Sequence, residues 1–196
     1  MAMAEVLPFR HEEAEDRTAF LGMVIFLGSW AMMFGAIFFA YGMVRLRAPA
    51  WPPPGVPAFP VLLPLLNTFV LAASSVTLQR GLTRMRGGKA GELRWWLLAT
   101  IGLGLVFLAL QAVVWLTLWR RGLRLSGGLE GGVLYGLTVF HALHVLSGLG
   151  ILGWLLTGAL RNAYSVKRFT PVRLTAMFWH FVDVVWVLMF LTVYLV

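Results

Sequence analysis

The sequence contains no cysteine and few charged residues. Without cysteine the chain forms no disulfide and binds no metal or cluster through thiolates. Charged residues make up 12% of its 196 residues, whereas soluble domains contain roughly 25%. The alternation of apolar and polar residues that is typical of membrane β-strands is also missing. These absences argue against an ordinary soluble domain, a disulfide-stabilised one and a membrane β-protein.

Long apolar runs take the place of charge. Hydrophobic residues make up 60% of the chain, and five stretches reach the roughly 20 residues that a membrane-spanning helix needs. They lie at 19–44, 61–82, 95–118, 133–160 and 174–196. The sequence therefore predicts an all-α, polytopic membrane bundle of five transmembrane helices, formed by residues 19–196 as one domain.

Residues 1–18 differ from the rest of the chain because they are rich in acidic side chains and have no apolar centre. A signal peptide would show a basic start and an apolar core. We expect a solvated cytoplasmic tail instead, with Asp16 or Thr18 available to cap the first helix.

The net charge of +8 reflects basic residues in the predicted loops. Eleven lie on the side of the N-terminus: Arg10, Arg17, Arg80, Arg84, Arg86, Lys89, Arg94, Arg161, Lys167, Arg168 and Arg173. Five lie on the other side: Arg45, Arg47, Arg120, Arg121 and Arg124. The positive-inside rule predicts a cytoplasmic N-terminus and a periplasmic C-terminus. The charge thus indicates topology and contact with anionic lipid headgroups, and not a nucleic-acid partner.

Uncharged polar residues occur inside two of the predicted helices. Asn67, Ser74 and Ser75 share one helical sector in the second, and Gln111 lies within the third. Polar side chains in membrane helices commonly form hydrogen bonds to a neighbouring helix, each worth about 1 kcal/mol. We expect that role for these residues.

Ionisable residues occur in the last two helices. His141 and His144 lie three positions apart, as do His180 and Asp183, so each pair shares a helix face. Asp183 is the only acidic residue inside a predicted span and should lie near the membrane midplane. We predict a buried polar seam of these four residues, in which Asp183 forms a hydrogen bond with His144, directly or through water.

Three functional interpretations compete with this structural role, in which the seam only joins two helices. The same side chains resemble a carboxylate–imidazole metal site, a bis-histidine haem site or a proton-transfer pair. His141 and His180 would lie about 15 Å apart along the membrane normal, which argues against the metal and haem sites. A proton relay would need further acidic residues in the first and third helices, and none is present.

Five segments together resemble one known family. They are "WPPPG" at 51–55, "PLLNTFVLAASS" at 64–75, "GLVFLALQA" at 104–112, "VFHALHVLSG" at 139–148 and "FWHFVDVVWVLMFLTVYL" at 178–195. The last is similar to the Trp-His-Phe-Val-Asp-x-Val-Trp signature of subunit III of haem–copper oxidases. The others resemble segments of the same family in the same order. The chain resembles the short five-helix bacterial form of that subunit.

The resemblance implies an accessory subunit, with no catalytic centre, haem or copper of its own, in an inner-membrane respiratory complex that reduces oxygen to water. Haems and copper are then expected in the partner subunits I and II, with direct contact to subunit I, and small subunits are possible further partners. The resemblance also implies bound phospholipid. Residues expected at lipid or subunit contacts are Trp51, Asn67, Arg80, Trp179 and Trp186. With four histidines and no cysteine, the chain lacks the ligands that subunits I and II supply.

Two positions depart from the family pattern. Trp30 and Val114 stand where the family usually has an intramembrane glutamate. This departure suggests a divergent branch that serves a quinol oxidase or a nitric oxide reductase. The alternatives from other classes are a haem-bearing membrane anchor and a small proton-coupled transporter. A transporter would be expected to show an internal repeat with broken helices, which the sequence lacks.

Overall fold

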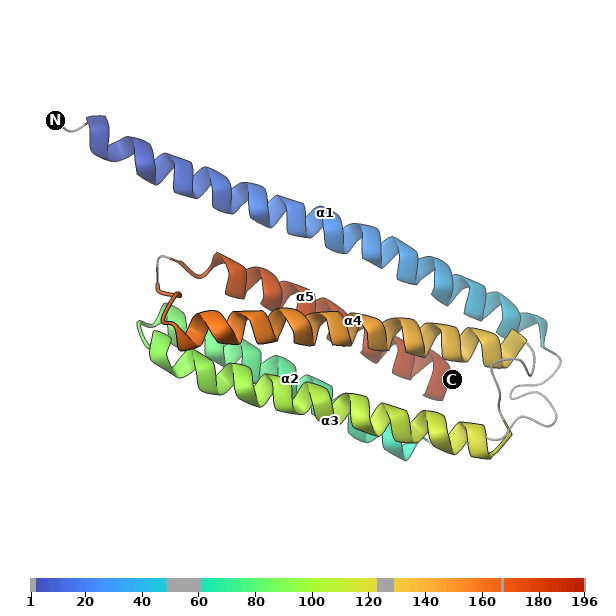
Figure 1. The fold of residues 1–196 in the computed structure, drawn as a ribbon. Helices are drawn as coiled ribbons and strands as arrows, with labels where there is room; N and C mark the ends of the chain where they lie inside the picture. Colours follow the sequence, from blue (N-terminus) through green and yellow to red (C-terminus); the bar gives the residue numbers. More distant parts are fainter. Residues whose placement is uncertain (1–2, 49–60, 123–128, 167, 196) are drawn as a thin grey trace.

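The computed structural model describes residues 3–48, 61–122, 129–166 and 168–195, and in these parts all regular structure is helical. The elements in chain order are α1 (Met3–Arg47), α2 (Leu62–Arg86), the short 3₁₀-helix η1 (Ala90–Glu92), α3 (Leu93–Arg120), α4 (Leu129–Leu160), α5 (Thr170–Met189) and the π-helix η2 (Phe190–Leu195) (Figure 1). The predicted all-α class is confirmed.

Five helical segments are long and apolar enough to cross a membrane: Glu15–Arg47, Leu62–Arg86, Ala90–Arg120, Gly132–Leu160 and Thr170–Leu195. The predicted five spans are therefore confirmed, and the last four begin and end within a few residues of the predicted bounds. The chain is a multi-pass membrane protein.

The first helix is longer than predicted, because α1 begins at Met3 and not near residue 19. The sequence "EEAE" at 12–15 consists of good helix formers, which allow the helix to continue outside the apolar span. Asp16 and Thr18 lie inside this helix, so neither caps it. Asp16 Oδ1 instead accepts a 2.6 Å hydrogen bond from Thr170 Oγ1 at the start of α5.

Helices α2 to α5 form a four-helix bundle in which each helix packs on the next and α5 packs back on α2. Helix α1 lies outside this bundle against α4 and α5, and Figure 1 shows its N-terminal part projecting away from them. Phe34 and Tyr41 are the only large apolar or aromatic side chains of α1 that are fully buried among the described residues. The core therefore lies between α2, α3, α4 and α5.

Two short turns hold neighbouring helices antiparallel at one end of the bundle. After α2, Gly88 adopts a φ of 84°, and Lys89 N donates to Arg84 O at 3.0 Å. After α4, Asn162 adopts a φ of 54°, and Ala163 N donates to Gly158 O at 3.0 Å. Both are Schellman-type helix ends, which favour glycine or asparagine because the backbone is left-handed there.

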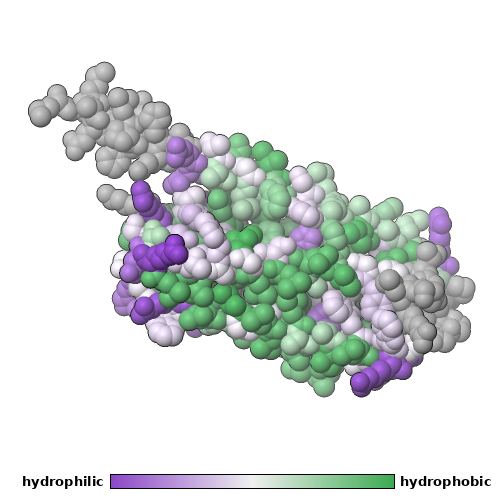
Figure 2. Space-filling model, in the orientation of Figure 1, coloured by the Kyte–Doolittle hydropathy of each residue, from purple (hydrophilic) through white to green (hydrophobic). Residues whose placement is uncertain are grey.

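The hydropathy of the surface matches a bilayer. Figure 2 shows apolar residues over the middle of the molecule and hydrophilic residues gathered toward its ends. At one end, the guanidinium groups of Arg86 and Arg173 lie 4.9 Å from the ring centre of Phe169 and 4.6 Å from that of Phe20, respectively. At the other end, Arg45 donates a 3.2 Å hydrogen bond to the carbonyl of Thr192. These cations lie where lipid headgroups would surround them.

Candidate functional site within the helix bundle

The four ionisable residues of the predicted seam separate into two pairs. His141 and His144 on α4 are buried, with 1% and 6% of their surfaces exposed. His180 and Asp183 on α5 are only partly buried. The pairs face different neighbours, so they do not form one seam.

His144 faces α1. Its Nδ1 lies 2.7 Å from the carbonyl oxygen of Phe140, and since a carbonyl only accepts, Nδ1 carries the proton of this bond. Its ring packs edge-on against Trp30, Phe34 and Phe140, with ring centres 4.2, 5.1 and 4.8 Å away. Trp30 thus stands at a position where the family usually has a glutamate, and it covers His144 with an aromatic ring.

His141 lies deeper in the bundle, between aromatic rings of two other helices. The centres of the Phe107 and Trp186 rings lie 5.9 and 5.4 Å from that of His141. Neither ring nitrogen has a hydrogen-bond partner among the residues that the structure describes.

Asp183 and His180 face α2. His180 Nε2 lies 3.2 Å from Gln79 Oε1 and donates to it, because an amide oxygen only accepts. The carboxyl group of Asp183 interacts with Ser75 and His180. Its Oδ1 is buried and makes no hydrogen bond of standard geometry to the described residues.

The predicted hydrogen bond between His144 and Asp183 is therefore wrong, because the two side chains face different helices. Trp179, Val182 and Trp186 on α5 are almost fully buried and face the centre of the bundle. Residue 183 follows 182 by about 100° around the helix, which turns Asp183 away from α4 and toward α2. The i, i+3 spacing correctly predicted that His180 and Asp183 share one face of α5, but it did not identify α2 as the helix that this face contacts.

The predicted interhelical hydrogen bonds of Asn67, Ser74 and Gln111 are confirmed. Asn67 Nδ2 donates to Gln111 Oε1 at 3.3 Å, joining α2 to α3. Ser74 Oγ accepts a 2.9 Å bond from Trp179 Nε1, joining α2 to α5. Ser75, the third member of that sector, lies beside Asp183, but its Oγ makes no hydrogen bond of standard geometry to the described residues.

Three further hydrogen bonds between helices were not predicted from the sequence. Trp186 Nε1 donates to Thr68 Oγ1 at 3.0 Å, and Trp115 Nε1 donates to Thr138 Oγ1 at 3.1 Å. Thr77 and Thr100 share a 2.9 Å hydrogen bond between their hydroxyls. The tryptophans were the sequence signal for the first two of these bonds, because a buried indole N–H usually finds a hydrogen-bond partner.

The residues predicted at lipid or subunit contacts lie in different places. Asn67, Trp179 and Trp186 are fully buried inside the chain, so their expected contact with lipid or another subunit is wrong. Arg80 is exposed, and Trp51 lies outside the described residues. Val114, at the other position where the family usually has a glutamate, is fully buried in α3. Apolar side chains thus occupy both of these positions.

No group of three histidine, aspartate or glutamate side chains converges as a metal site within the described parts of the chain. The geometry provides instead two shallow apolar cavities beside α1. One of about 230 Å³ lies between α1, α4 and α5 and includes Trp30, His144 and Phe178. The other, about 460 Å³, lies between α1 and α4 and includes Ile37 and Phe140.

Comparison with known proteins agrees with this architecture. The family described as cytochrome c oxidase subunit III matches residues 3–196 of the chain. The chain belongs to the cytochrome c oxidase subunit III family. The resemblance in the sequence motifs is thereby confirmed, and membership of subunit III means association with other subunits of an oxidase.

Relatives in this family come from distant organisms. The chain is 34% identical over 186 residues to cytochrome c oxidase subunit 3 of Thermostichus vulcanus, covering 94% of this chain and 90% of the relative. It is 36% identical over 175 residues to that of Synechocystis sp., covering 89% and 74%. It is 34% identical over 179 residues to that of Mus musculus, covering 88% and 67%.

The hydrogen bond between Asn67 and Gln111 can be tested by a double-mutant cycle. Each of Asn67→Leu and Gln111→Leu should lower the free energy of unfolding by about 1 kcal/mol, and the double substitution should cost less than their sum. The measurement is unfolding in mixed detergent micelles. Thr117→Val is the control, because among the described residues its hydroxyl bonds to its own helix, at Val113 O. Strict additivity would contradict the bond.

Proposed function

We propose that this chain is the accessory subunit III of a bacterial haem–copper oxidase, a respiratory complex that reduces oxygen to water. The observation that carries the proposal is the match to the subunit III family along residues 3–196. In this proposal the haems and copper are bound by subunits I and II. The chain itself stabilises subunit I and has no catalytic centre.

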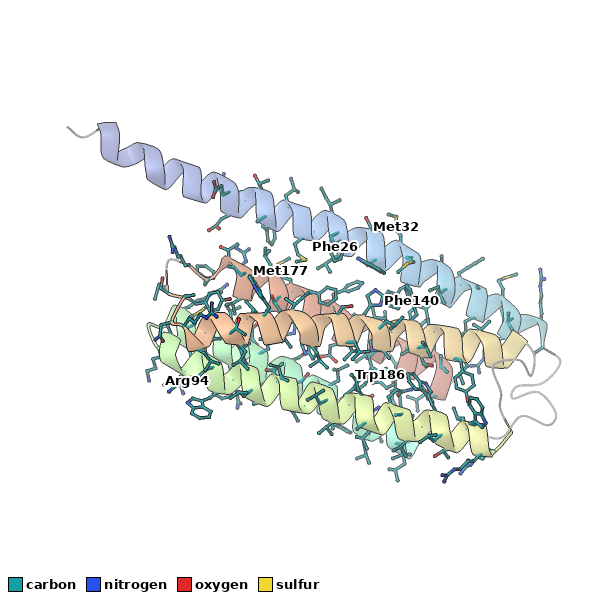
Figure 3. All side chains as sticks on the ribbon, viewed as in Figure 1. Phe26, Met32, Arg94, Phe140, Met177 and Trp186 are labelled. Carbon is teal, nitrogen blue, oxygen red and sulfur yellow. The ribbon has the colours of Figure 1, made fainter. Side chains whose placement is uncertain are left out.

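The proposed partners are subunit I in direct contact, subunit II, small subunits and membrane phospholipids. Much of α1 is exposed to what would be lipid or a neighbour, including Ile25, Met32 and Phe39 at 62%, 73% and 71%. Figure 3 shows Met32 pointing away from the other helices and Phe26 lying on the side of α5. The two apolar cavities beside α1 suit acyl chains, and arginines at the helix ends suit lipid phosphates.

The proposed location is the bacterial inner membrane, with the N-terminus in the cytoplasm and the C-terminus in the periplasm. The asymmetric distribution of basic residues between the two sides supports this orientation. The helical extension of α1 before Glu15 would then project into the cytoplasm.

A second candidate is a subunit III-like component of a quinol oxidase or a nitric oxide reductase. The observation that favours it is the apolar surroundings of Trp30 and Val114, where the family usually has glutamates. The ring centres of Trp30 and His144 lie 4.2 Å apart, so an aromatic ring, and not a carboxyl group, contacts this histidine from position 30. The two candidates share the same accessory role and differ in the electron donor of the complex, cytochrome c or quinol, or in the molecule that it reduces, oxygen or nitric oxide.

The test is purification of the tagged chain from native membranes in mild detergent. We expect a large haem-bearing subunit to co-elute, recognised by mass spectrometry and by its visible absorption spectrum. Oxygen consumption with reduced cytochrome c or with quinol, and nitric oxide consumption, would then separate the two candidates. A colourless chain that elutes alone would contradict the proposal and favour a free-standing membrane protein.

A further inference from the structure

Four polar side chains form a strip along the seam between α2 and α5. Ser75 and Gln79 lie four positions apart on α2, and His180 and Asp183 lie three apart on α5, so each pair shares a helix face. The His180–Gln79 bond and the approach of Asp183 to Ser75 connect the two pairs. We call this set the α2–α5 polar strip.

The strip reaches the outside of the bundle. Ser75 is buried, whereas Gln79 is exposed, and His180 and Asp183 are partly exposed. It differs in this respect from the Asn67–Gln111 pair, which is fully enclosed. The strip is thus a polar surface and not only an internal tie.

Its position is deep in the membrane. Asp183 lies near the middle of the 26-residue span Thr170–Leu195, about 18–20 Å from either end at the rise of an α-helix. An aspartate at the centre of a spanning helix carries a large insertion penalty, so such residues normally face protein or water. Acyl chains have no hydrogen-bond donor to offer it.

The chain itself supplies few donors to Asp183. A carboxyl group has room for several donors, and the described residues that interact with it are Ser75 and His180. His180 already donates its Nε2 proton to Gln79. Because Oδ1 is buried, a donor from outside the chain would bond to the other oxygen of the partly exposed carboxyl group.

Apolar side chains surround the strip. Val76 on α2 is 49% exposed, and Val184 and Leu188 on α5 are 58% and 47% exposed. An apolar surface with a polar centre suits another transmembrane helix, because membrane helices associate through packing supplemented by hydrogen bonds. The partner helix would carry its own polar side chain at mid-membrane depth.

The outer faces of α3 and α4 lack this combination. On α4, Ser147 is exposed at a similar depth, but its hydroxyl bonds to Leu143 O of its own helix. On α3, the exposed residues include Leu98, Leu105 and Val113, which are all apolar.

We propose that the α2–α5 polar strip is the docking surface for a transmembrane helix of the haem-bearing partner subunit, which donates a hydrogen bond to Asp183 from a hydroxyl, amide or indole group. The inference rests on the proposed function and adds the face by which the chain binds its complex. A helix that carries a hydrogen-bond donor complements the Asp183 carboxyl group, whereas lipid acyl chains carry no donor.

Photo-crosslinking in native membranes tests the contact without disturbing the strip. A benzophenone amino acid at Val184 should crosslink to the haem-bearing subunit, identified by mass spectrometry of the adduct. The same probe at Leu143 on α4, which is similarly exposed at 53%, should give no such adduct. Crosslinking from Leu143 but not from Val184 would overturn the proposal.

Substitutions test the hydrogen bond. Asp183→Leu should lower the amount of haem-bearing subunit that co-purifies by about tenfold, the effect of one lost hydrogen bond at the upper end of the usual range. Asp183→Asn, which keeps an acceptor oxygen, should lose less. Ser147→Leu is the matched control and should lose nothing. Each chain must first be shown to accumulate in the membrane at the unmodified level.

The outcomes separate this inference from the proposed function. If no haem-bearing subunit co-purifies with the unmodified chain, the proposed function fails. If it co-purifies equally with the unmodified chain and with Asp183→Leu, and Val184 gives no crosslink to it, the function stands and the docking surface is wrong.

Discussion

Replacing Gly148 by valine is expected to separate α4 from α5 and to prevent the bundle from packing. A Cβ atom at Gly148 would lie 2.8 Å from Cε3 and from Cζ3 of Trp179 and 3.2 Å from Cε1 of Phe178. These are atoms of rigid rings, so one of the helices would have to move. Small residues at helix contacts allow this close approach in membranes.

Trp179 cannot move aside to accommodate the larger side chain. On α3, a Cβ at Gly104 would lie 3.1 Å from Cη2 of Trp179, so the indole is confined from that direction too. Its Nε1 is fixed by the bond to Ser74. Overpacking of this kind costs about 1–3 kcal/mol or more, which is a large part of the stability of a small bundle.

The measurement is the accumulation of the chain in membranes and its unfolding temperature in detergent. Gly150→Val is the control, because it lies two residues away on α4 and a Cβ there meets nothing within 4 Å. We expect Gly148→Val to lower both quantities strongly and Gly150→Val to leave them near their original values. Equal behaviour of the two variants would contradict this account of the helix contact.

Truncating Trp186 to alanine is expected to give the second large loss. The side chain is fully buried, and its ring packs perpendicular to Phe107 with ring centres 4.8 Å apart and lies 5.4 Å from the ring centre of His141. Figure 3 shows Trp186 pointing into the space between the helices. Removing a buried tryptophan costs about 3–5 kcal/mol through lost contacts and the cavity left behind.

Two further variants separate packing from hydrogen bonding at this position. Trp186→Phe keeps most of the packing but loses the bond to Thr68 Oγ1, so it should cost only about 1 kcal/mol. Trp154→Ala removes a tryptophan of α4 that is 62% exposed and should change the unfolding temperature little. The interpretation fails if Trp154→Ala destabilises the chain as much as Trp186→Ala.

The spans and the family could be recognised from the sequence because each depends on local information. A run of about 20 apolar residues satisfies the length of a spanning helix whatever its neighbours are. The family motifs are likewise read along the chain, and they agree with the match over residues 3–196. The interhelical role of Asn67 and Gln111 also followed, because an amide inside a membrane helix needs a partner.

The first helix shows where local information was incomplete. Apolar residues indicate the part of α1 that crosses the membrane, but its helix continues back to Met3 through polar residues that also favour helix. The contact of Asp16 with Thr170 joins residues far apart in the chain, so a capping role predicted from neighbouring residues was wrong.

By itself the sequence determined the helical spans, the family and which residues share each helix face. Only the tertiary structure decided how each helix is rotated about its axis, and therefore that Asp183 faces α2 while His144 faces α1. That rotation depends on packing between helices: Trp179 fits against Gly104 and Gly148, which orients α5 and turns the next face toward α2. Spacing along one helix contains no information about this fit, because the glycines that accept the indole lie on other helices.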